Sequence, residues 1–122
     1  WGDVGTELAI RLFGDESLFV GYSEIRYTAP VYAGDWMEYG GYIEKVGNTS
    51  LTCKFFAYKW MKDSKDENGN VINGSGAEMI NPPELCAYGT GTLMVAKNLQ
   101  RPEFGDPKFA ADAKAAGAKA FA

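Results

Sequence analysis

Three long segments rich in β-branched and aromatic residues constrain the fold of this chain most strongly. They span residues 18–28, 36–46 and 50–61. The first connection between them contains Pro30, which fixes φ, and Gly34, which supplies a turn. The second is the compact hairpin signal Gly47-Asn48. Because such short turns join neighbouring strands, the sequence predicts an antiparallel meander.

An amphipathic helix is expected ahead of these strands, at residues 1–12. Apolar residues recur there at helical spacing, namely Trp1, Val4, Leu8 and Leu12. Gly14 follows and ends the pattern. Because the pattern is already under way at the first residue, we expect the helix to begin upstream of this sequence, with a further strand before it.

The second half of the chain is less regular. Residues 62–81 are expected to form a polar, mobile excursion that Pro82-Pro83 closes, followed by a fourth strand at 85–96. The tail at 108–122 is rich in Ala and Lys and is expected to be a marginal helix, docked on a partner or frayed. The sequence thus predicts one α+β domain at 1–107, with the element order of a hotdog fold, in which a curved sheet wraps around a central helix.

Composition excludes several classes of function. The chain has 122 residues, 46% of them apolar, which suits a single core. Twelve basic against 16 acidic residues give a net charge of -4, so we expect no nucleic-acid partner. No run is long enough to span a membrane, and we expect no membrane partner.

The residues that are rare in this chain limit its chemistry. Histidine is absent, and the two cysteines, Cys53 and Cys86, are isolated in sequence. We therefore expect no metal site, no disulfide framework and a reduced, cytoplasmic location. Without imidazole, any proton transfer in an enzyme of this composition falls to carboxylates. The cysteines are expected to be buried apolar fillers.

Several short motifs resemble those of hotdog enzymes that act on acyl-CoA. The resemblance is carried by Pro30-Val31-Tyr32-Ala33-Gly34-Asp35, Val46-Gly47-Asn48-Thr49-Ser50, Trp1-Gly2-Asp3-Val4-Gly5-Thr6-Glu7-Leu8, Met37-Glu38-Tyr39, Thr52-Cys53-Lys54-Phe55 and Pro82-Pro83-Glu84-Leu85-Cys86. Together they narrow it to the family of β-alanyl-CoA ammonia-lyase and its relative 3-aminobutyryl-CoA ammonia-lyase, up to about Arg101. Members of that family carry another strand and a Gly-containing helix start before the position of Trp1.

The resemblance implies an activity and partners. It implies reversible loss of ammonia from a β-aminoacyl-CoA in cytoplasmic amino-acid fermentation, by a homodimer or a hexamer built from dimers. CoA enters as part of the thioester substrate, and no other cofactor and no metal is expected. An acyl-CoA thioesterase on the same fold, and a catalytically silent module that binds CoA thioesters, remain open as alternatives.

Two carboxylates are candidates for the proton transfers. Asp3 and Glu7 are four residues apart and share a face of the expected helix. We expect Asp3 to remove the α-proton and Glu7 to assist it, while backbone N–H groups at the helix start, ahead of Trp1, stabilise the enolate. The alternative is that Glu7 only pairs with Arg11 on the helix surface and that Asp3 is solvated.

The CoA moiety has weaker candidates. They are Gly47, Asn48, Thr49 and Ser50 at the hairpin turn, and the basic residues Lys54, Lys59, Lys97 and Arg101, which could reach phosphates. A plain hairpin turn and solvated lysines at a sheet edge are the alternatives. Gly89 and Gly91 could admit the pantetheine arm close to a strand or only mark a bulge.

Overall fold

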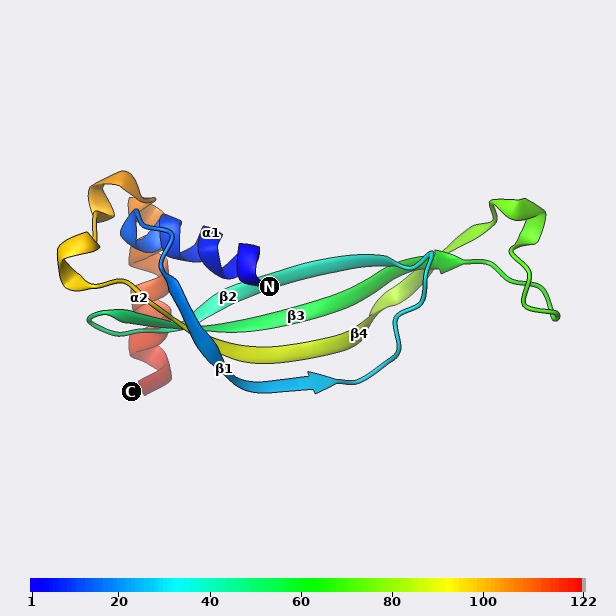
Figure 1. Cartoon of the computed structure of the whole chain (residues 1–122), viewed down its shortest axis with the longest axis horizontal. Helices are drawn as coiled ribbons and strands as arrows, with labels where there is room; N and C mark the ends of the chain where they lie inside the picture. The colour runs from blue at the N-terminus through cyan, green and yellow to red at the C-terminus, as the bar shows by residue number, and fades with distance from the viewer. Residues whose placement is uncertain (122) are drawn as a thin grey trace.

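The four strands that the structure describes form one antiparallel sheet in the order β1-β4-β3-β2, with helix α1 lying over one face at one end (Figure 1). The computed structural model describes the backbone of residues 1–121 and the side chains of residues 1–115. Its elements are α1 (Gly2–Phe13), β1 (Leu18–Tyr27), β2 (Trp36–Val46), β3 (Ser50–Asp63), η1 (Ile72–Gly74), β4 (Ala77–Met94), η2 (Lys97–Leu99), η3 (Pro102–Phe104) and α2 (Pro107–Phe121). The expected helix and the first three expected strands are confirmed.

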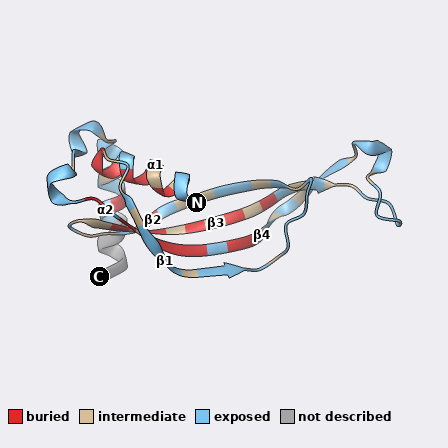
Figure 2. Ribbon diagram, in the orientation of Figure 1, coloured by how far each residue is buried: buried red, intermediate tan, exposed pale blue. Residues whose placement is uncertain are grey.

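Strand β3 is a central strand of the sheet, because it pairs with β2 on one side and β4 on the other. Its side chains alternate between a buried and a half-buried face. The buried row consists of Leu51, Cys53, Phe55, Ala57 and Lys59 (Figure 2). This row faces α1 at one end of the strand and continues past the helix towards the other end.

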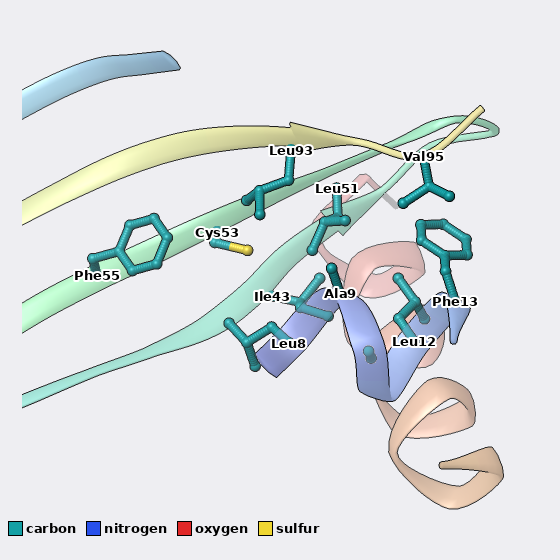
Figure 3. Close-up of a cluster of buried hydrophobic side chains, with 11 residues drawn as sticks. Leu8, Ala9, Leu12, Phe13, Ile43, Leu51, Cys53, Phe55, Leu93 and Val95 are labelled. Atoms are coloured by element: carbon teal, nitrogen blue, oxygen red, sulfur yellow. The ribbon is translucent and has the colours of Figure 1, made fainter. Parts of the chain in front are cut away.

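The hydrophobic core lies between α1 and this row. Leu8, Ala9, Leu12 and Phe13 of α1 point towards Leu51 and Leu93 of the sheet and towards Val95, which directly follows β4 (Figure 3). These side chains recur at i, i+1, i+4 and i+5, so the buried stripe of α1 is the helical face that the sequence indicates. Gly14 ends the helix in the left-handed conformation, with φ 63°, which glycine adopts without steric cost.

Aromatic rings extend the core beyond the start of α1. The Trp1 ring stacks on Phe55 with centroids 5.7 Å apart, and its Nε1–H donates to the Phe56 carbonyl oxygen at 3.0 Å. Phe19 and Tyr22 of β1 approach the same Phe55 ring, at 6.0 and 6.1 Å. Trp1 is therefore anchored on the sheet by both packing and a hydrogen bond.

The region expected to be an excursion is mostly a continuation of the β3–β4 ladder. Pairing runs on from Met61 with Met79 to Asp63 with Ala77, so β4 begins at Ala77 and the expectation of a start at residue 85 is wrong. Pro82 and Pro83 lie inside β4, beyond the end of its pairing with β1 and at a shift in its register with β3. Because only one neighbouring strand is present there, the missing proline N–H groups break no second ladder.

The C-terminal segment differs from the frayed or partner-docked helix that we expected. In α2, Phe109 and Ala110 pack against the core and Ala113 is buried in it. The Arg11 guanidinium lies 5.6 Å from the centre of the Phe109 ring. At least as far as Ala113, this segment is packed on its own domain; the side chains at 116–122 lie outside the described residues.

None of the helices within the described part of the chain is both long and apolar enough to cross a membrane.

Candidate active site

Helix α1 places the two candidate carboxylates on its outer face. Asp3 lies in the first turn and Glu7 one turn later, and both are exposed. Glu7 Oε1 lies 3.3 Å from Arg11 Nη2, in a pair whose side chains are 64% and 47% exposed. The structure thus brings Asp3 and Glu7 onto one face, as expected, but that face points away from the chain's own sheet. The Glu7–Arg11 pair that we considered as an alternative does form.

Arg11 distinguishes the two carboxylates, because it engages Glu7 and not Asp3. Glu7 Oε1 accepts a hydrogen bond from Arg11 Nη2 at 3.3 Å. Side chains on an α-helix lean towards its N-terminus, so both carboxylates lie over the turn before their own Cα, and Asp3 is the nearer of the two to Trp1.

An apolar groove begins at Trp1 and follows the sheet away from the N-terminal end of α1. It encloses about 500 Å³, and its lining includes Trp1, Ile25, Tyr27, Pro30, Val31 and Tyr39. Ala57 and Ala87, a cross-strand pair of β3 and β4, supply small side chains at its floor. A groove of this volume and apolar character is suited to the acyl and pantetheine parts of a CoA thioester.

A buried ion pair lies past the groove, at the far end of the β3 row. Lys59 Nζ is 3.0 Å from Asp35 Oδ2, and both side chains are 7% exposed. Lys59 also donates to the Pro30 carbonyl oxygen at 2.9 Å, and Glu84 Oε1 lies 3.9 Å away. This arrangement corrects the view of Lys59 as a solvated or phosphate-binding lysine, because its ammonium has partners within its own chain.

The surroundings stabilise both charges of this pair. Burial by itself raises the pKa of Asp35. The hydrogen bond from the Tyr32 N–H and the nearby Lys59 ammonium together lower the pKa by more, so the net shift is downward. For Lys59, burial lowers the pKa, while the hydrogen bond and the charge of Asp35 raise it to a greater extent. A polar cavity of about 590 Å³ adjoins the pair and mixes lysines with carboxylates, so it has no single charge with which to select a ligand.

The sequence did carry a signal for this pair. Residues 51, 53, 55 and 57 alternate as buried positions, and Lys59 is the next in that series. A charged residue in an apolar row implies either a partner or the end of the buried face. The partner, Asp35, belongs to the Gly34-Asp35 turn, which was expected to be a connection and part of the motif at residues 30–35, but not to hold the partner of a lysine.

The hairpin residues proposed for CoA binding are partly engaged in holding the end of the sheet together. The Gly47 N–H donates to Ser50 O at 2.7 Å, which closes the turn. The Asn48 carbonyl accepts from Gln100 Nε2 at 2.6 Å, and the Thr49 carbonyl accepts from the Val95 N–H at 2.8 Å. These contacts tie the hairpin to the segment after β4. The side chains of Asn48, Thr49 and Ser50 are exposed or half-buried.

The three remaining basic candidates do not form one cluster. Lys54 lies on the face of β3 opposite the buried row, where its Nζ donates to Thr90 Oγ1 at 2.8 Å. Lys97 is exposed in η2, next to the hairpin contacts. The Arg101 guanidinium lies over the Phe104 ring at 4.7 Å, and its Nη2 is 3.5 Å from Gly14 O. The hairpin and Lys97 thus share one end of the sheet, whereas Lys54 occupies its outer face.

The glycines and cysteines of the sheet belong to the packing. A Cβ on Gly91 would lie 2.7 Å from Phe19 Cζ, and one on Gly89 would lie 3.1 Å from Trp1 Cζ3. The chain's own rings therefore occupy the space that we had considered for pantetheine. Cys53 and Cys86 are free and buried, and burial raises the pKa of Cys53 to about 12. Within the described residues no group of three or more His, Cys, Asp or Glu side chains is arranged to hold a metal ion.

Comparisons with known proteins point to one group of enzymes. The chain is 40% identical over 101 residues to 3-aminobutyryl-CoA ammonia lyase of Acetoanaerobium sticklandii, which covers 83% of this chain and 76% of that protein. It superposes on β-alanyl-CoA:ammonia lyase from Clostridium propionicum with a TM-score of 0.81 and 50% identity, over 93% of this chain and 76% of that one. No family model matches the chain.

More distant neighbours share the fold. A hexameric broad-specificity acyl-coenzyme A thioesterase matches with a TM-score of 0.63 at 18% identity, over 94% of this chain and 73% of that one. A hexameric hotdog-fold thioesterase of Campylobacter jejuni matches with a TM-score of 0.52 at 17% identity, over 76% and 61%. These two likenesses confirm the expected hotdog fold.

Proposed function

We propose, from the premise that this chain belongs to the family of hotdog CoA ammonia-lyases, that it catalyses the reversible elimination of ammonia from a β-aminoacyl-CoA. The observation that carries the proposal is the 40% identity to a 3-aminobutyryl-CoA ammonia lyase across 76% of that protein. The 50% identity to a β-alanyl-CoA:ammonia lyase supports β-alanyl-CoA as the preferred substrate.

The reaction assigns a role to each carboxylate on α1. We assign the base to Asp3, which takes the proton from the carbon next to the thioester carbonyl. The resulting enolate then expels the β-nitrogen, the C–N bond breaks, and acrylyl-CoA and ammonia leave. This division of roles is supported by Arg11, which pairs with Glu7 and not with Asp3, so Glu7 is assigned to orienting the ammonium. N–H groups at or ahead of the helix start would stabilise the enolate oxygen.

The apolar groove beside Trp1 is the proposed place of the acyl and pantetheine parts. Its position beside Trp1 brings a thioester to the turn of α1 that carries Asp3. For the nucleotide end of CoA, the candidates stay those named from the sequence: Gly47, Asn48, Thr49 and Ser50 of the hairpin, with Lys54, Lys97 and Arg101. The exposed hairpin side chains and Lys97 share one end of the sheet, at the opposite end of α1 from the groove, so they would meet the nucleotide of a CoA bound in the groove of a second copy.

A second copy of the chain would complete the site. Strand β1 is an edge strand, and Leu18, Val20 and Tyr27 on it are exposed. An unpaired edge with exposed apolar side chains favours pairing with another chain. A partner there would also approach the outer face of α1 and enclose Asp3. We propose a homodimer, alone or as the unit of a hexamer, in the cytoplasm, with no cofactor beyond the CoA of the substrate.

The test is to incubate the protein with acrylyl-CoA or crotonyl-CoA and ammonium. A lyase removes the enoyl absorbance and leaves the thioester intact. Release of a free thiol, detected with a disulfide reagent, would instead identify a thioesterase. Tight binding of either thioester without any turnover would identify a silent binding module.

The assignment of the carboxylates is tested separately. We expect Asp3→Asn to lower kcat at least a hundredfold, within the usual contribution of a general base. Glu7→Gln should have a smaller effect, and Glu16→Gln, an exposed carboxylate after the end of α1, serves as the matched control. Normal turnover in both Asp3→Asn and Glu7→Gln would defeat the assignment.

A further inference from the structure

We propose that Lys59 is a positioning residue for the substrate groove: paired with Asp35, it fixes the connection between β1 and β2 that forms one wall of that groove. The inference rests on the proposed function, because the groove is the place assigned there to the acyl-CoA. Neither residue touches the reacting atoms. They affect the reaction by fixing the position of the backbone at Pro30.

The wall begins where β1 ends, and it is held there by strand β4. The N–H groups of Thr28 and Ala29 both donate to the Cys86 carbonyl, at 2.8 and 3.3 Å. Thr28 Oγ1 donates to the Leu85 carbonyl at 2.6 Å. Pro30 and Val31, which line the groove, follow directly but lie past these bonds.

Lys59 holds the wall from the other side. Its ammonium reaches from β3 to the Pro30 carbonyl at 2.9 Å and to Asp35 Oδ2 at 3.0 Å. The same Oδ2 accepts from the Tyr32 N–H at 2.7 Å, so one carboxylate joins the lysine to the turn. The ammonium also lies 5.5 Å from the centre of the Tyr32 ring. The connection is therefore fixed at both ends, by β4 and by Lys59.

An ion pair is a costly way to stabilise this position. Replacing a buried pair by apolar side chains is often neutral or stabilising, so such a pair is weak evidence for stability alone. A methionine at residue 59 would continue the apolar row of β3 but could not donate to Pro30 O. What Lys59 supplies, and an apolar residue does not, is a directed bond to the groove wall.

The position of that wall bears on substrate choice. β-Alanyl-CoA and 3-aminobutyryl-CoA differ by one methyl group, and a hydrophobic pocket distinguishes such a pair by about tenfold to 200-fold when its walls are rigid. If Pro30 and Val31 can move, the groove accepts both substrates more equally. Loss of the Lys59 bond should thus reduce discrimination and raise KM.

The experiment compares four proteins: the wild type, Lys59→Met, Asp35→Asn and the double variant. The control is Lys62→Met, on the same strand as Lys59, which removes a lysine from an exposed pair with Glu78 of β4. Ammonia addition to acrylyl-CoA and to crotonyl-CoA gives kcat and KM for each substrate. Unfolding midpoints are measured in parallel.

We expect the double variant to regain the stability that each single variant loses, since it leaves no unpaired charge. Its discrimination, which is the ratio of kcat/KM for acrylyl-CoA to kcat/KM for crotonyl-CoA, should nevertheless stay about tenfold closer to one than in the wild type. Most of this change should come from KM. If the double variant regains both stability and discrimination, the pair is only structural and the inference is overturned. A wild type that adds ammonia to neither substrate overturns the proposed function, and the inference with it.

Discussion

Asparagine at position 35 removes one charge from the buried pair while keeping the shape of the side chain. In the structure, Asp35 Oδ2 lies 3.0 Å from Lys59 Nζ and both side chains are 7% exposed. The asparagine oxygen can still accept from the Tyr32 N–H, which donates to Asp35 at 2.7 Å. The change therefore isolates the charge of Asp35 from its role in the turn.

The expected cost follows from what remains around Lys59. Breaking a buried pair by removing one partner costs about 3 to 5 kcal/mol. Lys59 keeps the Pro30 carbonyl at 2.9 Å and the half-exposed Glu84 at 3.9 Å, so the low end applies, about 3 kcal/mol. Since a domain of this size is stable by about 5 to 15 kcal/mol, the loss is a large share of the total.

Urea unfolding followed by tryptophan fluorescence measures this cost, with a lower midpoint and an unchanged slope expected at neutral pH. The pKa of Asp35 is lowered in the folded state, so its contribution is present above the unfolded pKa of about 4. That contribution is lost as the pH falls through the folded pKa. The wild type and Asp35→Asn should therefore converge in acid.

Alkali should also bring the two proteins together. The pKa of Lys59 is raised by folding, so its contribution is complete below the unfolded pKa of about 10.4 and is lost as the pH rises through the folded value. Lys62→Met, at an exposed pair, should leave the midpoint almost unchanged. An Asp35→Asn midpoint equal to that of Lys62→Met, or a gap that widens in acid, would refute this reasoning.

Three further predictions concern the core. Phe55→Ala should lower the free energy of unfolding, measured with urea, by about 3 to 5 kcal/mol. The reason is that a side chain only 1% exposed is lost from the centre of the aromatic cluster and leaves a cavity. A clearly smaller loss would show that the neighbouring side chains fill that cavity. Gly91→Ala should cost about 1 to 3 kcal/mol by crowding the neighbouring rings, whereas Gly21→Ala, where a Cβ meets nothing within 4 Å, should cost much less. Iodoacetamide should leave Cys53 and Cys86 unmodified in the folded protein and alkylate both in denaturant; labelling of the folded protein would contradict their burial.

Much of the fold is predictable because local patterns agree with it. The spacing of Trp1, Leu8 and Leu12 indicates the buried face of α1, and the alternation in β3 indicates its buried row. The early start of β4 was missed for a physical reason. The start at Ala77 depends on pairing with β3, which stabilises a segment next to two prolines that has no strand pattern of its own.

The candidate site is less predictable because it depends on contacts between distant segments. The shared face of Asp3 and Glu7 follows from helical spacing alone, and the structure confirms it. The partnership of Asp35 with Lys59 joins residues 24 positions apart, one in the turn before β2 and one on β3. The buried row of β3 implies a partner for Lys59, but nothing in the sequence identifies Asp35 as that partner. The roles of the hairpin residues and of Lys54, Lys97 and Arg101 in binding CoA stay predictions.

The most direct test of the central claim is to follow the thioester itself. The protein is mixed with acrylyl-CoA and isotopically heavy ammonium, and the products are identified by mass spectrometry. The account predicts an intact β-alanyl-CoA that carries the heavy nitrogen, formed by the wild type and by Glu16→Gln and nearly absent with Asp3→Asn. Free CoA and acrylate without any labelled thioester, or equal labelling by Asp3→Asn and the wild type, would contradict it.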